Sequence, residues 1–140
     1  MKYLIIINPA SGKKKSKYIF DSVVYPKLKN NKKKFEYEFT NKSYHAEHIV
    51  KEYDLSTIDA IIVLGGDGTM HEVVSGLLKR QDNLIVPIGL LPTGSGNSLL
   101  HDLNSLNTNK ALDEIFKNKY QSIDAIEISF NGKKYYSINL

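Results

Sequence analysis

The sequence predicts an α/β protein: a Rossmann-like parallel sheet with helices on both faces. Short apolar segments typical of buried strands alternate along the chain with patterns typical of amphipathic helices. Connections of this length join parallel strands through right-handed crossovers. Glycine-bearing segments follow the first, third and fourth expected strands, at the edge of the sheet where ligands of such folds bind.

Each element follows from a local pattern. The strands have continuous or alternating apolar residues and are expected at 3–8, 35–39, 58–64 and 86–91. The helices have apolar residues three or four positions apart and are expected at 16–28, 46–53, 70–78, 98–103 and 111–116. Pro26 lacks a backbone N–H, so we expect it to disturb the end of the first helix.

The last part of the chain has a different pattern. The segment IEISFNGKKYYSINL contains two strand-like runs joined by Asn131-Gly132, a pair typical of a type I′ hairpin turn. We therefore expect an α/β domain over 1–121 and a second, β-rich domain over 122–140, of which this chain contains only the first hairpin.

Composition restricts the class of protein. The 140 residues are 41% hydrophobic and 24% charged, as in ordinary globular domains, and the lack of cysteine excludes disulfides and thiolate zinc sites. No apolar run approaches the ~18 residues that span a bilayer, and the run at 3–8 is too short for a signal peptide. We expect a cytoplasmic protein.

The net charge is +4, and lysines are concentrated in the first 34 residues. Such a cluster attracts nucleotide phosphates, anionic lipid or nucleic acid, and it is equally typical of a solvated face. Aromatic and basic residues do not interleave as they do in single-strand binders, so nucleic acid is not an expected partner. Peripheral contact with a membrane stays open. The pattern carries no prediction of the oligomeric state.

The three glycine-bearing segments are NPASGKK, GGDGT and PTGSGN. Glycines before a helix let backbone N–H groups approach a phosphate, and the helix dipole favours the anion. Neither G-x-x-x-x-G-K-[ST] nor G-x-G-x-x-G occurs, so the common nucleotide signatures are absent. The segments therefore indicate phosphate binding of another kind.

Asp67 lies among these glycines, where a carboxylate is unfavourable for an anion unless it has a function. It could accept the proton of a substrate hydroxyl that attacks phosphorus, or it could hold a Mg²⁺ ion that bridges the phosphates. The structural alternative is a turn aspartate that bonds to its own backbone.

Thr69 and Glu72 match the S/T-x-x-E capping box, which alone would explain both residues as caps of the following helix. The segment HEVVS lacks the second histidine of H-E-x-x-H, because position 75 is serine. Zinc-dependent hydrolysis is therefore rejected.

Four segments together resemble the catalytic domain of diacylglycerol kinases and sphingosine kinases. They are NPASGK (8–13), Thr40 before the helix that contains Ala46, GGDGTMHEVVSGL (65–77) and LPTGSGNSLL (91–100). GGDG alone also occurs in phosphofructokinases and NAD kinases. GGDG followed by HEVV, with GSGN after the next strand, is specific, and the serine in GSGN is most similar to the sphingosine and ceramide kinase branch.

The resemblance implies an ATP-dependent lipid kinase that transfers the γ-phosphate to a hydroxyl of a sphingoid base, ceramide or diacylglycerol, with Mg²⁺. It implies a phosphofructokinase-like N-terminal α/β domain that binds ATP, followed by a β-sandwich domain that completes the lipid site. Residues 122–140 would be the first hairpin of that sandwich. On its own, the 140-residue chain is then expected to be weak or inactive as a kinase.

The functional residues of the family carry over by motif. Asp67 is the implied catalytic base. The implied nucleotide-pocket residues are Asn8, Pro9, Ala10, Thr40, Gly66, Gly68, Thr69, Glu72, Gly94, Ser95, Gly96 and Asn97. No residue is implied as a dedicated metal ligand.

Two other functions stay open. An NAD kinase-like enzyme would share GGDGT, but PTGSGN argues against it. A non-catalytic nucleotide-binding module would need neither Asp67 nor Glu72, and both are present together with the glycines.

Overall fold

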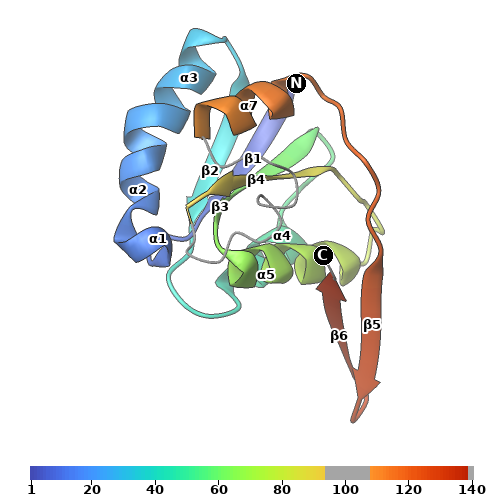
Figure 1. Cartoon of the computed structure of the whole chain (residues 1–140). Coiled ribbons are helices and arrows are strands. Elements are labelled where there is room, and N and C mark those ends of the chain that lie inside the picture. The colour runs from blue at the N-terminus through green and yellow to red at the C-terminus, as the bar shows by residue number, and fades with distance from the viewer. Residues whose placement is uncertain (94–107, 139–140) are drawn as a thin grey trace.

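The computed structural model describes residues 1–93 and 108–138. Its centre is a four-stranded, fully parallel sheet in the order β2-β1-β3-β4 (Figure 1). The strands are β1 (Lys2–Ile7), β2 (Lys34–Phe39), β3 (Ala60–Gly65) and β4 (Ile88–Pro92). The predicted Rossmann-like parallel sheet is confirmed, with strand ends one or two residues from those expected.

Helices cover both faces of the sheet, as predicted (Figure 1). One face carries the helical segment 11–30 and α7 (Thr108–Phe116). The other face carries α4 (His45–Glu52) and α5 (Asp67–Leu78). The helix expected at 98–103 lies outside the described residues.

The helical segment 11–30 differs from the predicted helix. Its parts are α1 (Ser11–Lys14), α2 (Ser16–Ile19), the π-helical turn η1 (Phe20–Val24) and α3 (Tyr25–Asn30). A π-helical turn interrupts the α-helix directly before Pro26, so the expected disturbance is present, but the helix then continues to Asn30. In the wide turn before it, the Tyr25 N–H bonds to the Phe20 carbonyl. Pro26 thereby falls in the first turn of α3, where a missing N–H is tolerated.

The core lies on both sides of the two central strands. In β1, Tyr3, Ile5 and Ile7 point toward α7, whereas Leu4 and Ile6 point toward α4 and α5. All five side chains are inaccessible to solvent. Burial on both faces explains why this strand reads as a continuous apolar run rather than an alternating one.

The predicted hairpin is also present. Strands β5 (Ala125–Phe130) and β6 (Lys133–Ile138) pair antiparallel in a separate two-stranded sheet. Asn131 and Gly132 both have positive φ, of 50° and 74°, as a type I′ turn requires. Ile138 is buried in the core cluster that covers α5, so the hairpin is anchored to the α/β layer.

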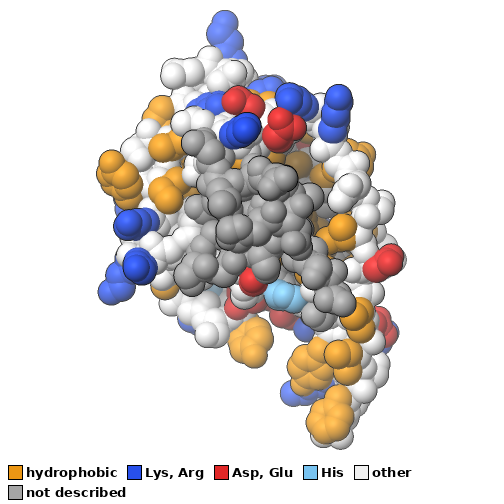
Figure 2. Space-filling model, in the orientation of Figure 1, with side chains coloured by type: hydrophobic (Ala, Val, Ile, Leu, Met, Phe, Trp, Pro, Cys, Tyr) orange, Lys and Arg blue, Asp and Glu red, His pale blue; other side chains and the backbone are white. Residues whose placement is uncertain are grey.

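The outward side of the hairpin is apolar. Ile126, Ile128 and Phe130 alternate along β5 and are each about half exposed or more. Figure 2 shows apolar side chains gathered where the hairpin projects from the molecule. Within the described residues, no helix is long and apolar enough to cross a bilayer.

Candidate functional site

The strand order defines a crevice between β1 and β3. The connection that leaves β1 covers one face of the sheet, and the connection that leaves β3 covers the other. Adjacent strands with such opposed connections leave a gap beyond their carboxyl ends, and open α/β sheets bind their ligands there. The expected site residues that follow β1 and β3 are Asn8, Pro9, Ala10, Gly66, Asp67, Gly68 and Thr69.

Asn8 joins the two sides of this crevice. Its backbone N–H donates to the Leu64 carbonyl at 2.9 Å, which continues the sheet for one more residue. Its Oδ1 accepts from the Ala10 N–H at 3.0 Å, and its Nδ2 donates to Thr69 Oγ1 at 3.0 Å. The segment after β1 is therefore held against the first turn of α5.

The Gly-Gly-Asp-Gly segment starts α5 earlier than the sequence pattern predicted. The helix begins at Asp67 rather than Met70, because the Met70 N–H bonds to the Gly66 carbonyl and closes the first turn. Gly66 is the N-cap residue, and no side chain of the described residues caps the helix. The N-terminus of a twelve-residue helix thus opens on the crevice, where its dipole favours an anion.

The glycines of this segment have different surroundings. A Cβ on Gly65 would lie 2.6 Å from Thr69 Oγ1, so Gly65 is required for packing. A Cβ on Gly68 would meet nothing within 4 Å, and Gly68 is exposed. The backbone of Gly68 is therefore open to a ligand.

Asp67 is the first residue of α5 and is half-buried. A carboxylate in the first helical turn interacts favourably with the helix dipole. Its position between Gly66 and Gly68 brings an acidic group to the same helix end that suits a phosphate. Among the described residues, no three His, Cys, Asp or Glu side chains form a metal-binding group. One carboxylate beside bound phosphates is nevertheless a usual environment for Mg²⁺, which keeps most of its water ligands.

The predicted capping box is wrong. Thr69 lies inside α5, and its Oγ1 accepts a hydrogen bond from Asn8 instead of capping the helix. Glu72 directs its carboxylate to another helix: Oε1 accepts from the Tyr44 N–H at 2.8 Å, and Oε2 from the Ala46 N–H at 3.2 Å. The sequence pattern missed this role because the partners of Glu72 lie 26 and 28 residues earlier in the chain.

Thr40 lies at the carboxyl end of β2. Its N–H donates to the Ile7 carbonyl at 2.8 Å, and its side chain is buried. Thr40 is therefore held directly beside the end of β1. The structure brings the segments after β1, β2 and β3 to one edge of the sheet, as predicted.

The segment after β4 reaches the same edge at Thr93. Gly12 packs on the Thr93 backbone so closely that a Cβ would lie 1.7 Å from the Thr93 carbonyl oxygen. The Thr93 hydroxyl is buried and has no hydrogen-bond partner within the described part of the chain. The next expected site residues, Gly94, Ser95, Gly96 and Asn97, lie outside the described residues.

Lys13 and Lys14 are a feature that the sequence analysis did not find. Both have left-handed φ values, 55° and 66°, and they follow Gly12, which has φ 60°. Non-glycine residues rarely adopt this conformation, and such backbone strain is most frequent at functional sites. Both side chains are exposed, beside the segment that follows β1.

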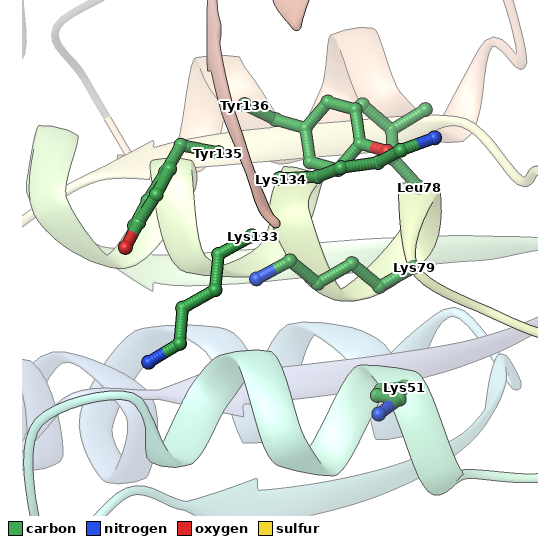
Figure 3. A pocket seen from close by; sticks show the side chains of 7 residues that line it. All are labelled: Lys51, Leu78, Lys79, Lys133, Lys134, Tyr135 and Tyr136. Atoms are coloured by element: carbon green, nitrogen blue, oxygen red, sulfur yellow. The ribbon is translucent and has the colours of Figure 1, made fainter. Parts of the chain in front are cut away.

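Two cavities lie away from this edge of the sheet. One, of about 490 Å³, has a basic lining of Lys51, Lys79, Lys133 and Lys134 with Leu78, Tyr135 and Tyr136 (Figure 3). It lies beyond the last turn of α5, whereas Asp67 begins that helix. The other, of about 820 Å³, is apolar and lies between α5, β4 and α7. Among the described residues, neither lining includes an expected site residue of the glycine-bearing segments.

Comparison with known proteins agrees with this arrangement. Residues 2–128 match the family described as the diacylglycerol kinase catalytic domain. The chain belongs to this family. The resemblance inferred from the four sequence segments is thereby confirmed.

Several kinases are similar to the chain. Sphingosine kinase 1 of Arabidopsis thaliana is 34% identical over 145 residues, which cover 98% of this chain and 30% of that protein. Sphingoid long chain base kinase 4 of Schizosaccharomyces pombe is 34% identical over 140 residues, with 97% and 31% covered. Human sphingosine kinase 1 is 40% identical over 106 residues, with 74% and 28% covered.

Solved structures show the same fold. A crystal structure of a diacylglycerol kinase from Bacillus anthracis str. Sterne matches with a TM-score of 0.74 and 27% identity, over 95% of this chain and 45% of that chain. The chain thus spans about 30% of the length of the curated relatives that it matches, and less than half of the solved kinase.

Proposed function

We propose that this chain is the nucleotide-binding part of a lipid kinase that transfers the γ-phosphate of ATP to a hydroxyl of a sphingoid base, ceramide or diacylglycerol. One observation carries the proposal. The hydrogen bond between Asn8 and Thr69 joins two of the family's motifs across the crevice between β1 and β3, where α/β sheets bind nucleotides.

The phosphates of ATP would lie at the N-terminus of α5. Backbone N–H groups of the first helical turn point outward there, and Gly66 and Gly68 let them approach an oxygen of the ligand. Asn8, Pro9 and Ala10 would contact the nucleotide from the β1 side, and Thr40 from the β2 side. By motif, Gly94, Ser95, Gly96 and Asn97 would complete the pocket.

Asp67 would act on the attacking hydroxyl. Its carboxylate accepts the proton of the lipid hydroxyl while the hydroxyl oxygen forms a bond to the γ-phosphorus. The bond between that phosphorus and the bridging oxygen breaks, and ADP leaves with the electron pair. A Mg²⁺ ion bound with ATP supplies positive charge to the phosphate oxygens. Asp67 is the carboxylate of these motifs that lies close enough to the α5 N-terminus to hold such an ion.

The lipid site would involve the hairpin. We propose that residues from 122 onward are the first hairpin of a β-rich domain, whose apolar side begins with Ile126, Ile128 and Phe130. These side chains alternate on one face of β5 and are exposed, as expected for a face that another layer covers. The separation of the β5–β6 sheet from the parallel sheet supports this division.

Peripheral contact with anionic membranes belongs to the same proposal. The first 34 residues contain ten lysines and one acidic residue, Asp21. Lys13, Lys14 and Lys15 are exposed beside the segment that follows β1. A basic surface near a lipid kinase site would raise the local concentration of substrate at an anionic bilayer. Sedimentation with phosphatidylserine vesicles at two salt concentrations tests this, and salt-insensitive binding would contradict it.

The experiment that tests the function compares acceptors. The protein is incubated with γ-labelled ATP, Mg²⁺ and, separately, sphingosine, ceramide, diacylglycerol or NAD. Label in one of the lipids is the expected result, at a low level for the 140-residue chain, and Asp67→Asn should abolish it. Label in the NAD sample would support the NAD kinase-like alternative. Nucleotide binding without transfer to any acceptor, also in a longer protein, would support the non-catalytic module.

The two roles of Asp67 are separable with the same variant. If Asp67 is the base, Asp67→Asn should bind Mg-ATP as the wild type does and lose only the transfer step. If Asp67 holds the metal, the variant should bind ATP equally well with and without Mg²⁺. Calorimetric titration under both conditions distinguishes the two.

A further inference from the structure

Glu72 connects the glycine-bearing motif to the segment that follows β2. It lies in the second turn of α5, and its two carboxylate oxygens accept from the backbone N–H groups of Tyr44 and Ala46, at 2.8 and 3.2 Å. Tyr44 is the N-cap residue of α4, and no side chain of α4 caps that end. A carboxylate from α5 thus serves as the N-terminal cap of α4, where the helix dipole also favours it.

The turn that Glu72 holds is strained. Tyr44 has φ 63° and ψ 5°, a left-handed conformation that is unfavourable for a residue with a Cβ. The Tyr44 side chain is 72% exposed, so packing of the ring does not impose this conformation. The bond from the Tyr44 N–H to Glu72 is therefore a principal contact that holds the backbone there.

The strained turn ends a segment that begins in the proposed nucleotide site. Thr40, at one end, is fixed to the sheet by its bond to the Ile7 carbonyl. Tyr44 and Ala46, at the other end, are fixed by Glu72. Between them the side chains of residues 41–44 are exposed. Within the segment, the Asn41 N–H donates to His45 Nδ1 at 3.0 Å and the His45 N–H donates to the Lys42 carbonyl at 3.3 Å. The bonds of Thr40 and Glu72 fix this turn to the sheet and to α5.

Helix α5 also fixes the rest of α4. Arg80, two turns after Glu72, donates to the carbonyls of Val50, Lys51 and Tyr53 at the carboxyl end of α4. In the middle of the contact, Gly76 lies so close that a Cβ would be 2.6 Å from the Glu47 carbonyl oxygen. The N-terminus of α4 is thus capped from α5, and its carboxyl end from Arg80, two residues after the last residue of α5.

We propose that Glu72 is a positioning residue of the nucleotide site: through the N–H groups of Tyr44 and Ala46 it holds the segment 40–44 against the crevice. This inference rests on the proposed function and deepens it. It adds a positioning role to the pocket role that the motif implies for Glu72, because each carboxylate oxygen accepts one backbone hydrogen bond from the α4 end. It also explains why a Glu follows the glycines at this spacing, one turn beyond Thr69.

The test uses three variants of the 140-residue chain. Glu72→Ala removes both acceptors, and Glu72→Gln keeps the side-chain volume and one acceptor. Glu47→Gln is the matched control, because it weakens another contact between α4 and α5, the ion pair of Glu47 with Lys79 at 2.7 Å. Hydrogen–deuterium exchange of segment 40–48 and calorimetric titration with Mg-ATP are measured for each.

We expect amide protection in segment 40–48 and Mg-ATP affinity to be lost together. Glu72→Ala should raise the exchange of the Tyr44 and Ala46 amides about tenfold or more and weaken Mg-ATP binding about tenfold. Glu72→Gln should give amide exchange and Mg-ATP affinity between those of the wild type and of Glu72→Ala. If Glu72→Ala does not fold, Glu72→Gln alone tests the inference. Glu47→Gln should change neither quantity by more than about twofold.

Three outcomes would overturn the inference. Weaker Mg-ATP binding with unchanged exchange would mean that Glu72 contacts the nucleotide directly. Faster exchange with unchanged Mg-ATP binding would mean that its role is only structural. Equal losses in Glu47→Gln would mean that any loosening of the α4–α5 contact has this effect. A folded wild-type chain that binds no Mg-ATP would instead refute the proposed function. The inference about Glu72 would then fall with it.

Discussion

Nδ2 of Asn8 donates a 3.0 Å hydrogen bond to Oγ1 of Thr69, 61 residues later in the chain. Asn8 follows β1 and Thr69 lies in the first turn of α5, so this bond spans the crevice between the two central strands. It relates two motifs that the sequence presents as separate. The geometry of the proposed phosphate site therefore depends on it.

Thr69→Val should remove this bond with little change in shape. The Asn8 amide would lose its acceptor, and we expect the free energy of unfolding to fall by about 1 kcal/mol. Mg-ATP binding should weaken as well, because the segment after β1 is released from α5. Urea unfolding and calorimetry measure the two effects. Thr69→Ser keeps the hydroxyl and serves as the control; if it loses as much Mg-ATP affinity as Thr69→Val, the hydrogen bond is not the cause.

Gly12→Ala should be strongly destabilising. Gly12 has φ 60°, and a Cβ would lie 1.7 Å from the Thr93 carbonyl oxygen, which belongs to the backbone. We expect a loss of at least about 2 kcal/mol in the free energy of unfolding. A variant as stable as the wild type would contradict the contact between the segments after β1 and β4.

Gly68→Ala should weaken Mg-ATP binding without lowering the free energy of unfolding. A Cβ there meets no atom within 4 Å, and alanine favours a helix, so the stability should stay equal or rise by up to about 1 kcal/mol. The same methyl group would stand in the path of a phosphate, so Mg-ATP binding should weaken about tenfold. Unchanged affinity in this variant would argue against the α5 N-terminus as the phosphate site.

Arg80→Ala should loosen α4 from its carboxyl end. The Arg80 side chain is buried, and its Nη1 donates to Val50, Lys51 and Tyr53 carbonyls while Asp82 pairs with the other nitrogens. Without it, buried carbonyl groups lose their donor, at a cost of about 2–4 kcal/mol. Arg80→Lys keeps the positive charge but lacks the planar guanidinium group with its several donors. It should therefore recover only part of the lost free energy of unfolding. Urea unfolding of both variants measures the difference, and full recovery with lysine would contradict the role of the guanidinium group.

The stability of the protein should depend on pH through Tyr53, which lies at the end of the sheet opposite the proposed nucleotide site. Burial, together with the hydrogen bond from its hydroxyl to Glu36, raises the pKa of Tyr53 from 10.0 to about 12. The unfolded chain then releases this proton at lower pH than the folded chain does. Stability from Tyr53 is therefore intact below pH 10 and declines between pH 10 and about 12. Tyr53→Phe should show a smaller decline over that interval in thermal unfolding, and an identical decline would contradict the pKa shift.

Sequence patterns predicted the parallel sheet well, because each strand and helix has its own local signal. Tyr3–Ile7 reads as a strand buried on both faces, and Asn131-Gly132 alone indicates the type I′ turn. The motifs also placed the expected nucleotide residues after the correct strands, since the carboxyl ends of parallel strands must share an edge.

The differences from the sequence predictions have several physical origins. Glu72 and Thr69 satisfied a local capping pattern, but both bond to residues far away in the chain. Pro26 was expected to disturb the helix end, and the disturbance takes the form of a π turn before it, after which the helix continues to Asn30. The left-handed backbone of Lys13 and Lys14 carries no sequence signal at all, because lysine has no preference for that conformation. Distant contacts therefore decide the case of Glu72 and Thr69, whereas a local backbone hydrogen bond decides the case of Pro26.

The most direct test of the central claim is titration of Mg-ATP into the folded wild-type chain and into Gly68→Ala, with circular dichroism to confirm that both are folded. We predict saturable binding by the wild type and about tenfold weaker binding by the variant at equal or greater stability. A folded wild-type chain that takes up no Mg-ATP at millimolar concentration, or a variant that binds it equally well, would contradict a nucleotide site at the α5 N-terminus.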